Sequence, residues 1–409
     1  MLSQQKILAV IMVFGLVMIS PILAYLGVRG IFVIVASLAI LFVVFRGGEV
    51  LIYYWFTGIA LVVFVLSFVP TIYWVDARYI LSPVFLIFSL FLIQLADQRA
   101  LDAFLTLSTA LMLVILVGAI IGFILVLNGV QPLFEIANND GRPNYFFYTT
   151  FSNSWWGRVI RPSGIYDEPG VLSFMVCGIA ALRHLRGRDS RVTWLMLGMG
   201  FVTLSLAHLI YVFFHVLAER LSFRNLAGIM ATLLPLVVIV GYLGGYEILE
   251  KRLLGRVTIT EAGELVGDIR SQRMVNAVEH LSAHPESILF GAHPSCRFDY
   301  MTCKEKFPLM GENPLSPLAF QGIFLSWAYY LALAVLLLAP LFGREYIVSF
   351  AFGALLLQRP YLLDVGYALI GCLVVAMTIE SIIARRYGRR LMLASKDRHV
   401  SMMQSHVSQ

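Results

Sequence analysis

Residues 103–127, AFLTLSTALMLVILVGAIIGFILVL, decide the fold class of this chain. The stretch has no charged side chain, and a helix needs about 20 apolar residues to cross a bilayer. Similar runs recur along the sequence, so 59% of the residues are hydrophobic and only 13% are charged. The mean hydropathy is +0.84, whereas soluble domains are about a quarter charged. We therefore expect an all-α polytopic membrane protein, with residues 1–409 forming a single integral domain in the lipid bilayer.

Twelve membrane spans are predicted from these apolar runs, and the basic residues of the short connections orient them. The clusters RHLRGRDSR (183–191), ERLSFR (219–224) and ARRYGRR (384–390) fall on one side. The positive-inside rule makes that side the cytoplasm, so both termini and the tail 385–409 are expected there. The predicted spans are residues 6–27, 30–45, 50–69, 79–95, 103–127, 169–185, 192–206, 208–219, 226–245, 316–340, 346–363 and 365–384.

The opposite face carries two long loops, residues 128–168 and 246–315. Loops of this length are usually functional or disordered, and Trp155 and Trp156 in the first loop favour order. The sequence has no Walker A, GxGxxG or HExxH motif, so nothing in it indicates a nucleotide domain. We expect no cofactor and no nucleic-acid partner.

The stretch RPSGIYDEPG (161–170) ends the first loop and precedes an apolar run. Pro169 suits the first turn of a helix. Glu168 would then lie at the helix N-terminus, where the macrodipole favours a negative charge. Gly164 would permit a tight backbone turn. In a simpler alternative the acids only cap the helix, and Arg161 is their ion-pair partner.

The second loop brings a similar set of side chains. Residues 269–281 have helical spacing, and Arg270 and Arg273 lie three residues apart on one face. Arginine suits bidentate recognition of phosphate. The segment GENPLSP enters the next span with Glu312 and Asn313 where the loop meets the membrane. The simpler alternatives are a solvated helix face and a turn with a cap.

Ionisable residues also occur inside the predicted spans. Arg359 lies near the outer end of one span, and a charge at that depth is a candidate functional group. Pairing with Asp364 is the simpler interpretation. His208 and His215 share one face of another span, and we interpret them as packing residues. Two histidines without a carboxylate make a poor metal site, so no metal is expected.

The four cysteines fall into two groups. Cys177 and Cys372 lie inside apolar runs. Cys296 and Cys303 share a polar loop and are a candidate disulfide if that loop faces an oxidising compartment.

Together, the two loops would place paired arginines and one acid each at the same outer membrane surface. The arginines suit a phosphate or diphosphate, and an acid nearby could act as general base for a hydroxyl. This combination favours transfer from a diphosphate leaving group onto an alcohol. Arginine would neutralise the departing charge, so the expected mechanism is independent of metal.

Several motifs resemble those of bacterial O-antigen polymerases of the Wzy type. RPSGIYDEPGVLSFM (161–175) resembles their R-x-x-G-x-x-x-E-P signature. SQRMVNAVEHLSAHPESILFGAHP (271–294) resembles the S-x-R … P … G-x-G stretch of their second large loop, with Gly-Ala-His in place of G-x-G. GENPLSPLAFQGIFLSWAYY (311–330) resembles H-N-x-x-L … G-I-x-G, with Glu312 in place of the histidine that usually marks ligases. TLSLAHLI (203–210) departs further from the family pattern.

The resemblance implies a membrane-embedded, GT-C-like glycosyltransferase in the bacterial inner membrane. It would join undecaprenyl-diphosphate-linked glycan repeat units at the periplasmic face, in lipopolysaccharide or exopolysaccharide biosynthesis. A chain-length regulator is a candidate partner. By position, Arg161 and Arg273 would bind the diphosphate, and Glu168 or Glu312 would act on the acceptor hydroxyl. The further candidates for substrate binding are Arg158, Arg270, Asn313, Arg359 and Tyr166.

Two other functions remain open from the sequence. One is an O-antigen ligase, which would use the lipid A core as acceptor. The other is a twelve-span polysaccharide transporter or flippase. Transporters usually show internal repeats and charges near the midplane, whereas the charges of this chain cluster at the outer surface.

Overall fold

The computed structural model describes residues 4–26, 54–137, 143–156, 159–219, 269–297, 310–364 and 366–385. These residues are mostly helical, and they include five helices that are long and apolar enough to cross a membrane. The five are Trp55–Trp74, Arg78–Leu95, Gln98–Leu127, Ser316–Phe342 and Gly366–Arg385, and the shorter apolar helices are Gln4–Val17, Pro169–Leu185 and Leu206–Ala218. Several apolar helices are what a membrane-embedded protein requires. The predicted spans 30–45 and 226–245 lie outside the described residues.

Local sequence signals set several helix boundaries. Helix α7 (Gln98–Leu127) contains the decisive apolar stretch, and it begins where the Asp97 side chain accepts a hydrogen bond of 2.7 Å from the Ala100 amide. Helix α8 (Pro169–Leu185) begins at the proline, as predicted. The first predicted span is instead divided into α1 (Gln4–Val17) and α2 (Pro21–Tyr25). Pro21 has no amide hydrogen to continue the helix, which explains the break.

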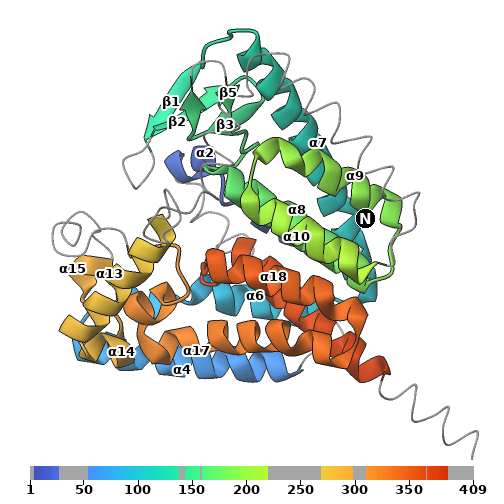
Figure 1. Cartoon of the computed structure of the whole chain (residues 1–409). Coiled ribbons are helices and arrows are strands. Elements are labelled where there is room, and N and C mark those ends of the chain that lie inside the picture. The colour runs from blue at the N-terminus through green and yellow to red at the C-terminus, as the bar shows by residue number, and fades with distance from the viewer. Residues whose placement is uncertain are drawn as a thin grey trace, which may run out of the picture.

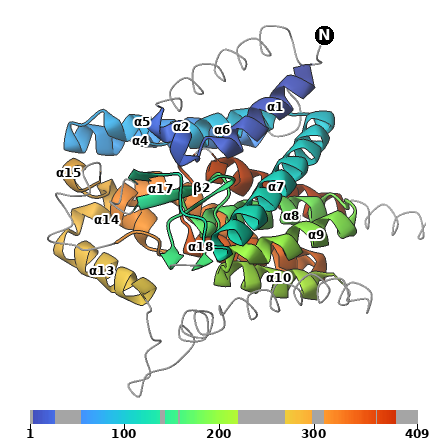
Figure 2. The ribbon, with the colours of Figure 1, turned by 90° about the horizontal axis from the view of Figure 1, so that it is seen from above.

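The helices pack in layers (Figures 1 and 2). Besides α1, α7 and α8, these layers contain α4 Tyr54–Trp74, α5 Arg78–Leu81, α6 Val84–Leu95, α9 Ser190–Gly200, α10 Leu206–Ala218, α17 Ser316–Leu338 and α18 Ile347–Gln358. Helix α4 packs on α6 and α17, α17 packs on α18, and α18 packs on α8 and α10. Helices α8 and α9 also pack on α7, and α7 packs on α1.

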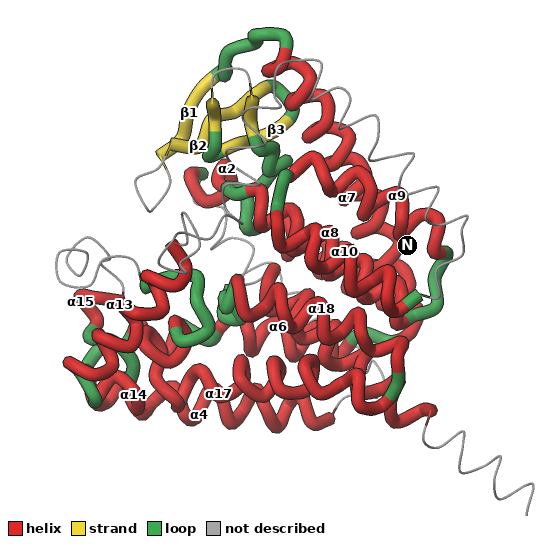
Figure 3. The backbone as a smooth tube through the Cα atoms, viewed as in Figure 1, coloured by secondary structure: helices red, strands yellow, loops and turns green. Residues whose placement is uncertain are grey.

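The first long loop contains strands that the all-α expectation did not include (Figure 3). Strands β1, β2 and β3 form an antiparallel sheet in that order, and β4 pairs with β5. Aromatic residues favour strands, and Phe146 lies opposite both Phe134 and Phe151 across the sheet. The described part of the loop is therefore ordered, as its aromatic content predicted. The strands are β1 Phe134–Ala137, β2 Pro143–Phe147, β3 Thr150–Ser152, β4 Trp155–Trp156 and β5 Val159–Ile160.

Gly164 fastens the end of this loop to the sheet. Its φ of 63° is left-handed, so the prediction of a tight glycine turn is confirmed. The Phe151 amide donates a hydrogen bond of 2.7 Å to the Gly164 carbonyl. The Gly164 amide donates one of 2.8 Å to Thr150 Oγ1. The turn thereby fixes the backbone that leads to Glu168 and α8.

The described part of the second long loop contains three helices. It contains α13 (Ile269–Ala283), α14 (Glu286–Phe290) and α15 (Pro294–Arg297), and α14 packs against α17. Helix α17 is kinked at Gly322, whose φ is 65° and ψ is 173°. A Cβ atom at Gly322 would collide with the carbonyl group of Leu289. Only glycine therefore lets the loop approach α17 so closely.

Candidate functional site

Four charged side chains from four separate segments form one continuous row, which we call the ion network. Arg359 Nη2 lies 2.6 Å from Glu168 Oε2, and Arg359 Nη1 lies 3.8 Å from Glu312 Oε1. Arg273 Nη1 donates a hydrogen bond to Glu312 Oε2. The four side chains are only 12 to 19% exposed. Solvent therefore screens these charges much less than it would at an open surface.

Glu168 occupies the N-cap position of α8, but its side chain does not cap the helix. The backbone has the extended geometry of an N-cap residue, with φ of −135° and ψ of 145°. No side-chain capping hydrogen bond is formed. The simple capping interpretation of this acid is therefore wrong, because its carboxylate contacts Arg359 instead.

Arg359 follows the last turn of α18, and its pairing differs from the simpler interpretation of the sequence. The guanidinium contacts Glu168, which is 191 residues away in the chain. Asp364, the partner suggested by sequence proximity, lines the cavity described below. The guanidinium rests against the first turn of α8, where a Cβ atom at Gly170 would lie 2.9 Å from its Cζ and Nε atoms. Because Gly170 has no side chain, the Arg359 guanidinium can lie against this turn.

Adding a methyl group at this position should test that close approach. Gly170→Ala is expected to destabilise the protein by about 1–3 kcal/mol, because overpacking displaces the guanidinium from Glu168. The measurement is the midpoint of thermal unfolding in detergent. Gly58→Ala is the matched control, since a Cβ there meets no heavy atom within 4 Å. This control should gain up to about 1 kcal/mol of helix propensity. Equal midpoints for the two variants would contradict the prediction.

Glu312 is held in a conformation that residues other than glycine rarely adopt. Its φ is 59°, which costs about 1–3 kcal/mol and is common at functional sites. The buried Asn313 supports it, since Asn313 Nδ2 donates to the carbonyl oxygens of Met310 at 2.5 Å and Arg273 at 3.2 Å. Asn313 Oδ1 accepts from the Leu315 amide at 2.8 Å. Asn313 therefore joins this turn to α13, which brings Arg273 to Glu312.

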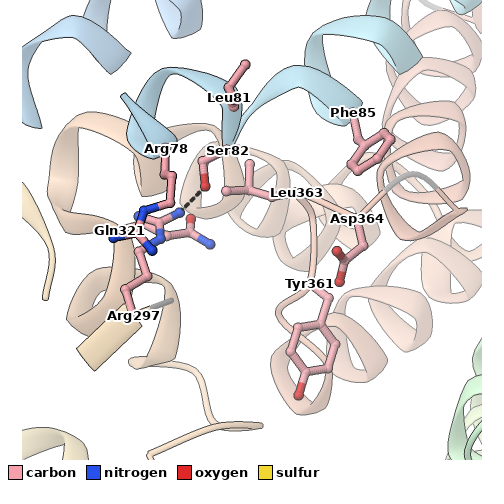
Figure 4. A pocket seen from close by; sticks show the side chains of 9 residues that line it. All are labelled: Arg78, Leu81, Ser82, Phe85, Arg297, Gln321, Tyr361, Leu363 and Asp364. Carbon is pink, nitrogen blue, oxygen red and sulfur yellow. Dashed lines mark hydrogen bonds between the residues drawn. The ribbon is translucent and has the colours of Figure 1, made fainter. Parts of the chain in front are cut away.

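A cavity of about 420 Å³ adjoins the ion network through Tyr361. Figure 4 shows the side chains that line this cavity. Its volume is in the usual range for ligand pockets, about 300–1,000 Å³. Tyr361 connects the two features, because it lines the cavity and interacts electrostatically with Glu312, Arg359 and Glu168. The lining residues are Arg78, Leu81, Ser82, Phe85, Arg297, Gln321, Tyr361, Leu363 and Asp364. Two arginines and one carboxylate thus contribute to the wall, and the arginines are groups that can bind an anion.

Arg297, at the end of α15, forms part of the cavity wall (Figure 4). Its Nη1 donates a hydrogen bond of 2.9 Å to the Phe320 carbonyl, and its Nη2 donates one to Ser82 Oγ. Its Cζ lies 4.8 Å from the centroid of the Tyr79 ring, within the range of a cation–π contact. Burial lowers the pKa of Arg297 to about 10. The guanidinium therefore stays charged at neutral pH.

Arg78 supplies the second cation of the cavity. Its Nη2 lies 2.6 Å from Asp76 Oδ2. The hydrogen bond from the Arg78 side chain lowers the pKa of Asp76, so this carboxylate is ionised at neutral pH. Arg78, Arg297 and Tyr361 were not among the residues proposed from the sequence. The signal for Arg78 was an Arg at the mouth of a predicted span, two residues after an acid.

Of the other predicted site residues, the structure describes the side chains of Arg161 and Tyr166. Arg161 Nε donates a hydrogen bond of 3.3 Å to the carbonyl of Thr203, whereas Arg359 holds Glu168. Tyr166 is fully buried, so its side chain belongs to the core. Arg270 lies in α13, but its side chain is not among those described. Arg158 lies outside the described residues.

The cysteines divide as the sequence suggested. Cys177 and Cys372 are buried free thiols. Cys296 is disulfide-bonded, and the one remaining cysteine of the chain, Cys303, lies outside the described residues.

No protein-family model, curated protein or solved structure matches this chain. The function is therefore inferred from two sources. One is the chemistry of the ion network and the adjoining cavity, and the other is the resemblance of the sequence motifs.

Proposed function

We propose that this protein is a polysaccharide polymerase that joins undecaprenyl-diphosphate-linked repeat units at the periplasmic face of the bacterial inner membrane. The observation that carries the proposal is the ion network beside a cavity whose wall contains two arginines. Arginines and carboxylates in one partly buried site supply both needs of this reaction. The cations favour the diphosphate leaving group, and a carboxylate can take the proton of the acceptor hydroxyl.

We further propose a GT-C-like membrane domain of twelve spans with both termini in the cytoplasm. The ends of α8 support this orientation. Glu168 of the ion network precedes its first turn, and Arg186 and Arg188 follow its last turn. Both arginines lie close to Asp102, at 3.1 and 2.7 Å. By the positive-inside rule this basic end faces the cytoplasm, so the ion network faces the periplasm.

The proposed reaction assigns a role to each part of the site. The lipid diphosphate of the growing chain binds in the cavity near Arg78 and Arg297, and Arg359 and Arg273 extend the positive charge toward Glu312. The acceptor hydroxyl of the incoming unit attacks the anomeric carbon of the donor sugar. A new glycosidic C–O bond forms, the C–O bond to the diphosphate breaks, and the hydroxyl proton passes to Glu312. Undecaprenyl diphosphate leaves with the bonding electrons.

A strain that lacks this protein provides the test. We expect it to lose long glycan chains while single repeat units still reach the lipid carrier or the core, because only the joining step is missing. The readout is the size distribution of the surface polysaccharide, and the wild-type gene should restore long chains. If full-length polymer persisted, the proposal would be wrong. Lipid-linked polymer that never reaches the core would indicate a ligase, and units trapped on the cytoplasmic face would indicate a flippase.

A further inference from the structure

A second polar cluster lies at the other end of α8, near the ends of two predicted spans. His184 Nδ1 lies 3.5 Å from Glu219 Oε1, and His215 Nε2 lies 3.7 Å from the same oxygen. One ligand atom from each of the three residues falls within 4.8 Å of the other two. His184 is in the last turn of α8, His215 is in the last turn of α10, and Glu219 follows α10.

The three groups converge at a separation close to that of metal ligands. Zinc binds histidine nitrogen and carboxylate oxygen at about 2.0–2.2 Å, so tetrahedral ligand atoms lie about 3.4 Å apart. Two of the three separations, 3.5 and 3.7 Å, are close to this value, and all three ligand atoms lie within 4.8 Å of one another. His215 is fully buried, and its Nε2 has no hydrogen-bond partner among the described residues. A buried imidazole nitrogen that points at a carboxylate without a hydrogen bond is well placed to coordinate an ion.

We propose that His184, His215 and Glu219 bind a zinc-class divalent transition metal ion. Two imidazoles and one carboxylate leave a fourth position for water, as in open zinc sites. Imidazole suits zinc and its neighbours, whereas calcium and magnesium prefer oxygen ligands. The ion would join the ends of α8 and α10 at the face opposite the ion network.

Neighbouring side chains orient these ligands. Trp194 Nε1, on α9, donates a hydrogen bond of 2.7 Å to Glu219 Oε2, which leaves Oε1 directed toward both imidazoles. The Tyr211 hydroxyl lies 3.4 Å from His215 Nδ1, so the opposite ring nitrogen is the one available to a metal. Outer contacts of this kind fix the tautomer and orientation of metal ligands. The ligands thus belong to a set of side chains drawn from three helices.

The sequence alone concealed this site. From the sequence, His208 and His215 are interpreted as packing residues, and two histidines without a carboxylate make a poor metal site. The structure gives His208 other contacts, with the Leu197 carbonyl at 2.8 Å and Cys177 Sγ at 3.4 Å. His215 instead faces Glu219, four residues later. His184 joins them from a helix that is distant in the sequence.

The site is separate from the proposed polymerase chemistry. Pro169 and His184 are fifteen positions apart in α8, which is about 22 Å along the helix axis at 1.5 Å per residue. Metal binding can therefore be measured without any assay of polymerisation. A failure of one proposal would leave the other standing.

The experiment uses the full chain, purified in detergent through a tag that contains no histidine. After treatment with a chelator the protein is dialysed against Zn²⁺, and bound metal is measured by mass spectrometry. We expect about one zinc per chain in the wild type, with none retained in His215→Gln or Glu219→Gln. Trp194→Phe should weaken zinc binding by about 10–100-fold through loss of the outer hydrogen bond. His284→Gln is the matched control, because His284 also contacts a carboxylate, Glu286, at 3.2 Å outside this site. The control should bind zinc like the wild type.

Cobalt provides a second measurement that does not depend on the folding of the variants. Co²⁺ bound to the wild-type protein should show the intense visible bands of four-coordinate geometry. If only the weak bands of six-coordinate cobalt appear, the proposal is overturned. Zinc binding to the folded wild type at less than one ion per chain would also overturn it, as would unchanged binding in both ligand variants.

Discussion

Arg359→Leu is expected to destabilise the folded protein by about 3–5 kcal/mol and to abolish long-chain polymer. The substitution removes the cation that contacts Glu168 at 2.6 Å and approaches Glu312 at 3.8 Å. Deleting one partner of a buried ion pair leaves a charge in a poorly solvated place, and this is far more costly than losing an exposed pair. The measurements are the thermal midpoint in detergent and the polysaccharide profile of the complemented deletion strain.

A double-mutant cycle identifies the cause of this loss. Adding Glu168→Gln to Arg359→Leu neutralises the stranded carboxylate and should recover stability, with a coupling energy of about 0.5–3 kcal/mol. Arg344→Leu is the matched control at the other end of α18, where Arg344 Nε donates a hydrogen bond of 2.7 Å to the Leu217 carbonyl. This control substitution should lower the free energy of unfolding by about 0.5–1.5 kcal/mol. If the double variant were as unstable as the sum of the single variants, the two charges would not be coupled.

Glu312→Gln is expected to lower the polymerisation rate by about 10²–10⁴-fold while the protein remains folded. This range is the usual contribution of a general base, and the amide keeps the shape of the acid without its basicity. Two observations favour Glu312 over Glu168 for this role. It has the left-handed backbone, and it is 19% exposed against 12% for Glu168.

Glu168→Gln serves as the comparison, because we assign that acid to positioning Arg359. It should weaken binding of the lipid-linked donor, seen as a raised KM, more than it lowers kcat. Glu345→Gln is the control for a carboxylate in an ion pair elsewhere, since Glu345 contacts Arg385. This variant should retain both parameters. A large fall in kcat for Glu168→Gln with little change for Glu312→Gln would reverse the assignment of the base.

The helix boundaries that were predicted well depend on local chemistry. Pro169 and the apolar run after it set the start of α8, and the uninterrupted stretch 103–127 set most of α7. The strands of the first loop were missed because each has only two to five residues. Segments so short carry too little alternation for a pattern to emerge. Their pairing is stabilised by partners across the sheet and by Gly164.

The candidate site shows the same division between local and distant information. The sequence could single out each of Glu168, Glu312, Arg273 and Arg359, because charged residues beside or inside apolar segments stand out in a chain that is only 13% charged. Their pairing could not be deduced, since Arg359 has Asp364 five residues away and yet contacts Glu168 across 191 positions. The cavity with Arg78 and Arg297 also required the fold, because its wall combines residues from four separate parts of the chain.

The sequence by itself determined that this is a mostly helical, membrane-embedded chain with two polar loops, because apolar length and charge position are local properties. Only the tertiary structure decided which charge meets which. It gave Glu168 an ion pair in place of the simpler capping alternative, and it supplied His215 with the carboxylate of Glu219. The physical reason is that an ion pair or a ligand set depends on separations of a few ångströms. Helix packing sets those separations, and periodicity along the chain does not encode them.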